Sequence, residues 1–427
     1  MRLIASLIMA IILIAPACAQ ERQPEPVPTG KPLTLADCID LALRNQPSVR
    51  QASAQVDARA GSVKQARSGL LPGVYVSSSS EVAGSSSSSG VQVSGGVEQL
   101  IYDMGRSRAG LDQARYLLEA GVSELAGSRA DLINSVKQAY YGFLRSSKLL
   151  SVYQENLKAQ EGHVAMAQAK MEAGVAPKAD LLKAESAAAS ARVDLVVAGN
   201  DAALARVELN STMGVNVQNP TEITDSAEPD APVPTVEDAL QQALRNRPEV
   251  RGVRNQVAAA QSAVDVAAAG DRPSFSTSIS DSYRSESGFD DHDSWTWMVN
   301  AQWQPFDSGL TRGKVEQARA QLVSAQESFY ETRQTISSQV VSARLYVVAA
   351  QESLAAARLE VASAQQELDA ATGRYQTGVG IFLEVTDAQA ALLKAQVDET
   401  SARYGLSMAR SALERAVGAT SVQGASN

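Results

Sequence analysis

Apolar residues recur at every seventh position over a long stretch in the second half of the chain. Alanine occupies the position three residues further on in each heptad. The two series are Val340, Val347, Leu354, Val361, Leu368 and Tyr375, and Ala343, Ala350, Ala357, Ala364 and Ala371. The pattern predicts a coiled-coil helix whose alanine positions let a partner helix approach closely.

The first half of the chain carries a less regular version of this pattern. Its large members are Val136, Phe143, Leu150, Leu157, Val164 and Met171, and its second series includes Tyr153 and Gln160. A glycine interrupts each helical pattern, at Gly174 and at Gly378, which are 204 positions apart. We therefore expect two long helical hairpins, with tips at about 173–178 and 376–382.

Two further segments, at about 73–102 and 273–306, alternate apolar with small or polar residues. In the second of them Trp295, Trp297 and Trp303 fall on one apolar face. The length and one-sided pattern are typical of transmembrane β-strands with interfacial aromatic residues. Surface hairpins on a soluble protein are the alternative. The serine run 85–89 and the acidic run 290–293 are expected to be solvent-facing loops.

The order of these elements indicates a duplicated chain. Leu43-Arg44-Asn45-Gln46-Pro47 returns as Leu244-Arg245-Asn246-Arg247-Pro248. The helix Leu35 to Ser68 and the helix after the first tip are each about half as long as the helix between them, so we expect them to stack end to end beside it. The predicted organisation is repeat 1 at 34–214, a linker at 215–234, repeat 2 at 235–418 and a tail at 419–427.

The amino terminus has the three regions of a secretory signal peptide, predicted at 1–19. A proline-rich tether at 20–33 follows it. Cleavage after Ala19 is one interpretation, and cleavage before Cys18, which would make Cys18 a lipid anchor, is the other. Under the first interpretation Cys38 is the only cysteine of the mature chain, and we expect it to be buried and inert.

Composition and charge exclude several classes of protein. After the signal peptide no run reaches the roughly 18 apolar residues of a membrane-spanning helix, so a membrane crossing would require strands. The net charge of −9 argues against a nucleic-acid partner. His163 and His292 have no ligand-spaced partners and are expected on the solvated surface. With no metal site, cofactor motif or nucleophile motif, we expect no enzymatic activity.

These features together resemble the outer-membrane efflux channels of the TolC type. The resemblance covers nearly the whole mature chain and rests on the duplication, the Leu-Arg-Asn-x-Pro starts, the strand hairpins and the motif from Arg374 to Gln389. It implies a mainly α fold with a β part, in which long coiled-coil hairpins form an α-barrel. It also implies a homotrimer, with four strands per chain in a 12-stranded transmembrane β-barrel.

The resemblance also implies partners and a location. Such a protein would lie in outer-membrane lipid, extend into the periplasm, and act as the exit duct of a tripartite efflux or type I secretion system. A periplasmic adaptor (membrane fusion) protein would contact the tips, at Gly174, Val175, Gly378 and Val379. An inner-membrane pump of the RND or ABC class would supply the energy. A periplasmic coiled-coil adaptor or structural spacer is the alternative function.

A pore gate at the helix tips is implied in the same way. The acidic residues of the family's closed iris fall on Glu384 and Asp387, and a family gate contact falls on Tyr375 and Asp180. A family arginine two residues past the tip glycine is replaced by Gly380. Without the resemblance, acids in the first turns of a helix would equally be explained by the helix dipole.

Overall fold

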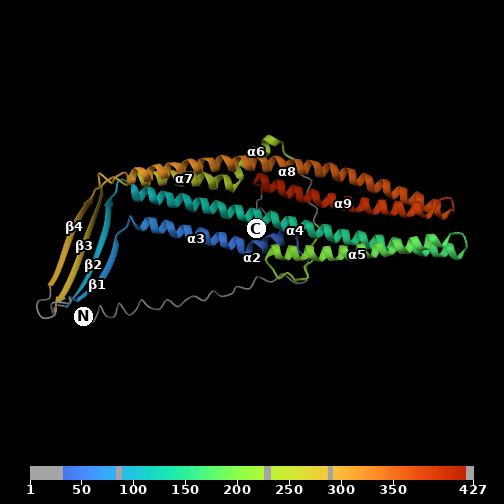
Figure 1. Cartoon of the computed structure of the whole chain (residues 1–427), viewed down its shortest axis with the longest axis horizontal. Coiled ribbons are helices and arrows are strands. Elements are labelled where there is room, and N and C mark those ends of the chain that lie inside the picture. Colours follow the sequence, from blue (N-terminus) through green and yellow to red (C-terminus); the bar gives the residue numbers. More distant parts are fainter. Residues whose placement is uncertain (1–31, 83–88, 226–231, 287–291, 420–427) are drawn as a thin grey trace.

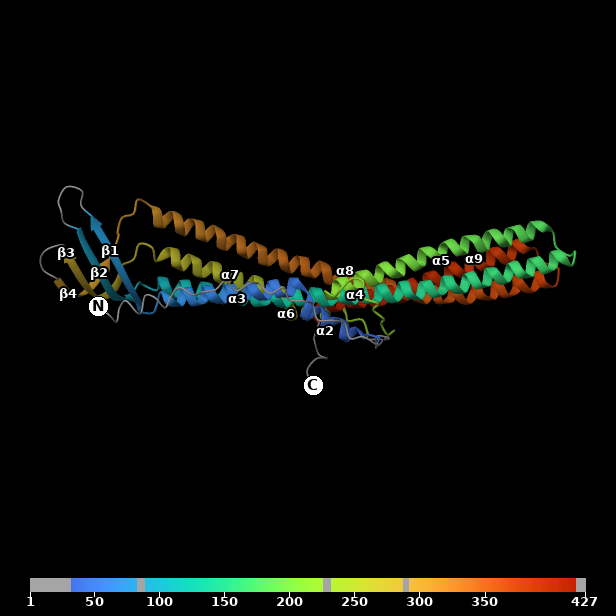
Figure 2. The same ribbon diagram turned by 90° about the horizontal axis from the view of Figure 1, so that it is seen from below.

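The computed structural model describes residues 32–82, 89–225, 232–286 and 292–419. Over this range the chain is an elongated molecule of long helices with a small sheet at one end (Figure 1). Figure 2 shows both helical hairpins extending side by side to the opposite end. The expected fold class, mainly α with a four-stranded β part, is confirmed.

The two halves have the same order of elements. The first contains α2 (Leu35–Asn45), α3 (Pro47–Ser68), β1 (Gly73–Val82), β2 (Ser89–Tyr102), α4 (Arg106–Glu172) and α5 (Lys178–Met213). The second contains α6 (Val236–Asn246), α7 (Pro248–Ala268), β3 (Ser274–Glu286), β4 (His292–Gln302), α8 (Leu310–Gln376) and α9 (Phe382–Val417). Helices α4 and α8 have 67 residues each, and α5 and α9 have 36 each. The long helices of the two repeats therefore have equal lengths.

The expected single helix from Leu35 to Ser68 is wrong in one respect, because Gln46 divides it into α2 and α3. Gln46 is extended, with φ −66° and ψ 124°, and Pro47 occupies the first position of α3. A proline disfavours the helical conformation of the residue before it. Arg247 and Pro248 repeat this break between α6 and α7.

Each long helix begins directly after the sheet at an aspartate–glycine turn. Gly105 and Gly309 adopt left-handed φ values of 87° and 89°. Two residues earlier, the carboxylates of Asp103 and Asp307 accept hydrogen bonds from the backbone N–H groups of Ser107 and Thr311, both at 2.7 Å. These bonds satisfy otherwise unpaired amides at the start of each helix and fix the angle between strand and helix.

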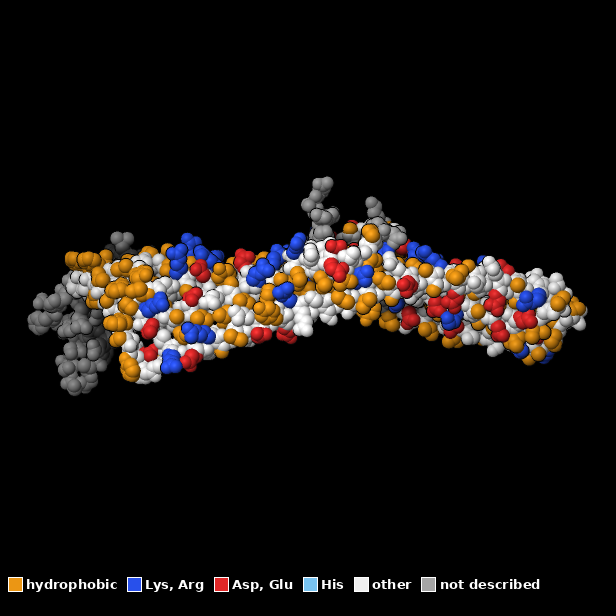
Figure 3. All heavy atoms as spheres, turned by 90° about the horizontal axis from the view of Figure 1, so that it is seen from above, with side chains coloured by type: hydrophobic (Ala, Val, Ile, Leu, Met, Phe, Trp, Pro, Cys, Tyr) orange, Lys and Arg blue, Asp and Glu red, His pale blue; other side chains and the backbone are white. Residues whose placement is uncertain are grey.

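The four strands form one antiparallel sheet in the order β1-β2-β3-β4. Directly paired residues place Val74, Val97, Ile279 and Trp297 in one row across it. The row lies on one face, since paired residues in a sheet share a side. Figure 3 shows apolar side chains gathered at this end of the molecule. The sheet thus exposes an apolar face, in which Trp295 and Trp297 are both solvent-accessible.

Trp303 is also exposed but lies one residue past the end of β4. Its indole N–H donates to the backbone oxygen of Asp271 at 3.0 Å. The two predicted loops lie mostly outside the described residues. Within the described range, Ser89 begins β2, and His292 and Asp293 belong to β4, so these three positions are strand rather than loop.

The residues of the heptad pattern in the second half form a buried contact between α8 and α9. Of its members Val340, Val347 and Leu354 are buried, and so are Ala357, Ala364 and Ala371. In the first half the large series is only half-buried beyond Val136. Helix α4 packs against α5 on one side and against α7 and α9 on another, so its buried surface is wider than a single seam.

The short helices lie along the long ones as expected. Figure 1 shows α3 and α5 in line beside α4, and α7 and α9 in line beside α8. Cys38 lies at the middle of the molecule in the core of α2, α4 and α5 and is fully buried. The expected burial of this cysteine is confirmed. Burial is the main cause that raises the pKa of its thiol to about 12, which favours the protonated thiol, and its inertness stays a prediction. Cys18 lies outside the described residues.

The two repeats are joined at mid-length by an ionic network around two buried arginines, Arg247 and Arg415. The Arg415 guanidinium on α9 donates to Asp131 of α4 at 2.7 Å and to Glu249 of α7, and Arg247 also contacts Glu249, at 3.2 Å. Burial alone would raise the pKa of Glu249, but the hydrogen bonds from Arg247 and Arg415 outweigh it and lower that pKa to about 2. This network fixes α7 and α9 of the second repeat against α4 of the first.

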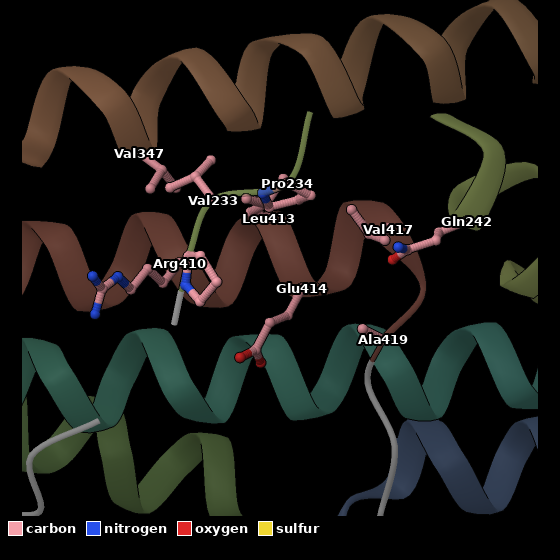
Figure 4. Close-up of a pocket in the computed structure, with 10 residues that line it drawn as sticks. Val233, Pro234, Gln242, Val347, Arg410, Leu413, Glu414, Val417 and Ala419 are labelled. Atoms are coloured by element: carbon pink, nitrogen blue, oxygen red, sulfur yellow. The ribbon is translucent and has the colours of Figure 1, made fainter. Parts of the chain in front are cut away.

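A pocket of about 250 Å³ lies near this network, between the linker residues 232–234 and helices α6, α8 and α9 (Figure 4). Apolar side chains such as Val233, Val347 and Leu413 line much of it. In Figure 4 the Glu414 side chain points toward α4, where its carboxylate accepts a hydrogen bond from Lys137 at 2.5 Å. Glu414 therefore contributes to the contact between the two repeats, far from the helix tips.

Candidate functional site: the helix tips

Both tips are tight turns closed by a glycine. Gly174 and Gly378 have φ values of 73° and 79°, which favour glycine. The next residues, Val175 and Val379, return hydrogen bonds at 3.0 Å to the carbonyls of Lys170 and Arg374, and both valine side chains are exposed. The four residues predicted for adaptor contact therefore form the two outermost points of the molecule, each with an exposed apolar side chain.

A small apolar cluster beneath the tips joins all four neighbouring helices. It contains Ala167 of α4, Ala184 of α5, Ala371 and Tyr375 of α8, and Phe382, Val385 and Ala388 of α9. The rings of Tyr375 and Phe382 lie 5.3 Å apart. Because alanines supply the surrounding positions, the two rings fill the space between hairpins and set their separation.

Tyr375 connects the second hairpin to the first. Its hydroxyl donates to Asp180 of α5 at 3.4 Å, and the Lys170 ammonium lies 4.3 Å from its ring centroid. Lys170 also donates to the Tyr375 carbonyl at 2.5 Å. Burial and the adjacent Asp180 carboxylate raise the pKa of the Tyr375 phenol, so the hydroxyl keeps its proton at neutral pH. The pair expected from the resemblance is thus in contact within one chain.

The two acids predicted for the iris lie on the exposed side of α9. Glu384 pairs with Arg374, whose Nη2 is 3.0 Å from the carboxylate, and both side chains are about half-exposed. Asp387 is exposed and has no ion pair among the described residues. Sequence reasoning missed Arg374 as a partner. The tip turn brings the end of α8 against the start of α9, and ten residues of separation gave no helical spacing signal.

Gly380 makes room for this arrangement. A Cβ atom at position 380 would lie 2.9 Å from the Arg374 Cβ and 3.1 Å from the Tyr375 backbone nitrogen. The close approach of the turn to α8 requires glycine here. A positive charge is present at this tip on Arg374, which pairs with Glu384.

The expectation that His163 is solvated is wrong. It is only 8% exposed, packed edge-on against the Phe382 ring at 6.5 Å, and its Nε2 lies 3.5 Å from the Gln389 side-chain oxygen. Gln389 also donates to Asn156 at 3.1 Å. Gln389 and Phe382 come from the other hairpin, 226 and 219 positions away, so local sequence gave no sign of this burial. For His292 the structure describes only its place at the start of β4.

Neither a metal site nor a membrane-crossing helix occurs in the described part of the chain. The described residues contain no group of three or more His, Cys, Asp or Glu side chains arranged to hold a metal ion. None of the described helices combines the length and apolar character needed to cross a membrane.

The fold and the paired hairpin tips define a class of elongated channel proteins, and sequence comparison supports this directly. Residues 38–215 and 239–419 match the Outer membrane efflux protein family, so the chain belongs to that family. It is an outer-membrane efflux channel, one of a family of trimeric channels that extend into the periplasm and are not enzymes.

The similarity to individual relatives extends over most of their length. The chain is 26% identical over 395 residues to Protein CyaE of Bordetella pertussis, covering 89% of this chain and 81% of that protein. It is 24% identical over 381 residues to the probable efflux pump outer membrane protein TtgC of Pseudomonas putida, covering 85% and 78%. The structure of the outer-membrane channel OprN superimposes with a TM-score of 0.80 at 21% identity, covering 90% of this chain and 89% of that one.

Proposed function

We propose that the chain forms the exit duct of a tripartite efflux or type I secretion system, with an iris gate at the periplasmic helix tips. The observation that carries the gate is the contact between Tyr375 and Asp180, which ties the second hairpin to the first at the outermost turns. The family match decides against the periplasmic adaptor that was the alternative function.

In this proposal each part of the molecule has one partner. The exposed face of the sheet, with Trp295 and Trp297, meets outer-membrane lipid, because tryptophan favours the membrane–water interface. The tips, with exposed Val175 and Val379, meet the periplasmic adaptor. An inner-membrane pump of the RND or ABC class drives transport.

Three copies of Glu384, Asp387 and Arg374 would surround the closed pore. Each Glu384 is partly neutralised by its arginine, so Asp387 is the uncompensated acid of the ring. A ring of carboxylates favours cations in a narrow pore. We therefore expect small, cation-preferring conductance from the native channel.

Single-channel recording of purified protein in a planar bilayer tests this arrangement. Asp387→Asn is expected to weaken cation preference. Glu384→Gln is expected to weaken it more than Asp387→Asn does, because it also leaves the positive charge of Arg374 unpaired. Arg374→Gln is the matched control and is expected to strengthen cation preference. Conductance should rise in the Glu384→Ala/Asp387→Ala double variant. Unchanged selectivity in all of these variants would contradict the acidic iris.

A further inference from the structure

Basic side chains gather where the helices join the sheet. Residues 66–72, 103–110, 269–273 and 303–314 form the four junctions at this end of the molecule (Figure 1). They contain three acids but six basic residues, although the whole chain has a net charge of −9. We call these six residues the junction cations. They are all exposed, and they are Arg67, Arg106, Arg108, Arg272, Arg312 and Lys314.

Few of these positive charges are neutralised within the chain. Arg312 pairs with Glu316 at 3.1 Å, and both side chains are highly exposed. The other five junction cations form no ion pair with any residue that the structure describes. Of the nearby acids, Asp103 and Asp307 accept hydrogen bonds from backbone N–H groups of α4 and α8. Because an exposed ion pair contributes little energy, the junction cations are available to an external anion.

Helix stability accounts for only part of this set of charges. Arg67 lies in the last turn of α3, where a positive charge is favourable to the helix dipole. Arg106 and Arg108 instead begin α4, and Arg312 and Lys314 lie in the first two turns of α8. Neither of these helices has an acid in its first turn. Cations at the start of a helix oppose its dipole, so the helices themselves give no reason for these four charges.

Exposed aromatic residues lie between the sheet and the junction cations. Tyr102, Trp303 and Phe306 are each more than half exposed. The indole N–H of Trp303 donates to the backbone oxygen of Asp271, the residue next to Arg272, at 3.0 Å. Aromatic residues favour the membrane–water interface, and basic residues just beyond it attract anionic headgroups. The apolar sheet face, the aromatic residues and the cations thus follow the order of hydrocarbon, interface and headgroups in a membrane.

We infer that the junction cations bind the phosphate groups of anionic phospholipids in the membrane leaflet that faces the periplasm. This inference rests on the proposed placement of the sheet in outer-membrane lipid and adds a headgroup site to it. Because cations outnumber acids at the junctions, a phospholipid with a net negative charge is favoured over a zwitterionic one. The acyl chains of the bound lipid lie against the adjoining apolar face, which includes Ile279 and Trp297.

Quenching of tryptophan fluorescence by brominated lipids tests this preference. The chain has three tryptophans, so Trp295→Phe/Trp297→Phe leaves Trp303 as a single reporter at the junction. This full-length variant is reconstituted into phosphatidylcholine vesicles that contain either dibrominated phosphatidylglycerol or dibrominated phosphatidylcholine. One cation at the membrane surface favours an anionic lipid about fivefold, so phosphatidylglycerol is expected to associate next to Trp303 about five times more strongly than phosphatidylcholine. High salt should reduce this preference.

Removing the junction cations of the second repeat should abolish the preference. Arg272→Gln/Arg312→Gln/Lys314→Gln is added to the variant that keeps Trp303, because these three cations flank Trp303 along the chain. The two brominated lipids are then expected to quench Trp303 with nearly equal association constants. A preference for phosphatidylglycerol that survives this change would overturn the inference.

A matched control removes the same number of charges from the tip half of the molecule. Lys158→Gln/Lys183→Gln/Arg358→Gln changes exposed positions only and should leave the lipid preference intact. If this control also loses the preference, the net charge of the protein and not the junctions carries the effect. Equal quenching of the starting variant by both lipids would contradict the headgroup site but leave the sheet in lipid as proposed. If neither lipid quenches Trp303, the proposed placement of the sheet fails as well.

Discussion

Tyr375→Phe is expected to shift the channel strongly toward its open state. The substitution removes the hydroxyl that bonds Asp180 and keeps the ring that packs on Phe382 and beneath Lys170. A hydrogen bond of this kind contributes about 1 kcal/mol, so three copies acting together would change the ratio of open to closed channels roughly a hundredfold. Open probability in single-channel recordings measures this ratio. Asp180→Asn should act in the same direction.

Tyr404→Phe is the matched control for this prediction. Tyr404 also donates to an aspartate, Asp225, at 3.1 Å, but it lies in the middle of the molecule, where the linker crosses α9. Burial and the nearby Asp225 raise its pKa to about 12, so the chemistry of the two pairs is alike. The control should alter thermal stability without altering open probability. Equal effects of both tyrosine substitutions on opening would contradict a gate at the tips.

Arg415→Met is expected to destabilise the folded chain severely. Arg415 is buried and bonds Asp131 and Glu249, so its removal leaves the partly buried Glu249 with Arg247 alone. Breaking a buried ion pair by removing one partner costs about 3–5 kcal/mol. Thermal unfolding followed by helical circular dichroism measures the loss. Arg403→Met removes an exposed pair with Asp225 and should cost less than about 1 kcal/mol.

The stability deficit of Arg415→Met should also depend on pH. The pKa of Glu249 is lowered in the folded chain, from an ordinary value of 4.5 to about 2. Its stabilising contribution is therefore fully present above about pH 4.5 and is lost as the pH falls toward 2. The difference between native and variant unfolding temperatures should narrow over this range. A difference that stays constant from about pH 6 to about pH 3 would show that the Glu249 pair does not carry the effect.

Regular patterns along the chain predicted the fold because they are local. The alanine heptad from Ala343 to Ala371 indicated a close helix pair, and α8 packs on α9 through it. The glycine at each tip was recognisable because the left-handed turn restricts that position to glycine. The break at Gln46 was also visible in the sequence as the residue before a proline, but the helical pattern on both sides obscured it.

The contacts of the candidate site depend on which helices pack against each other. No local pattern in the sequence indicates this pairing. From the sequence alone, His163 was expected on the exposed surface of α4. It is buried because α9 places Gln389 and Phe382 against it. The pairing of Arg374 with Glu384 likewise exists only because the tip turn folds α9 back on α8. The resemblance gave the position of Tyr375 and Asp180, and the structure shows them in contact, but their part in gating remains a prediction.

The most direct test of the gate is chemical modification of the channel at Asp387. In a planar bilayer, Asp387→Cys channels are expected to lose current in steps when a bulky neutral thiol reagent is added from the tip side, and to recover on reduction. Asp112→Cys is the control, since Asp112 is partly exposed at the sheet end of α4. If modified Asp387→Cys channels conduct as unmodified ones do, the tips are not the constriction of the pore.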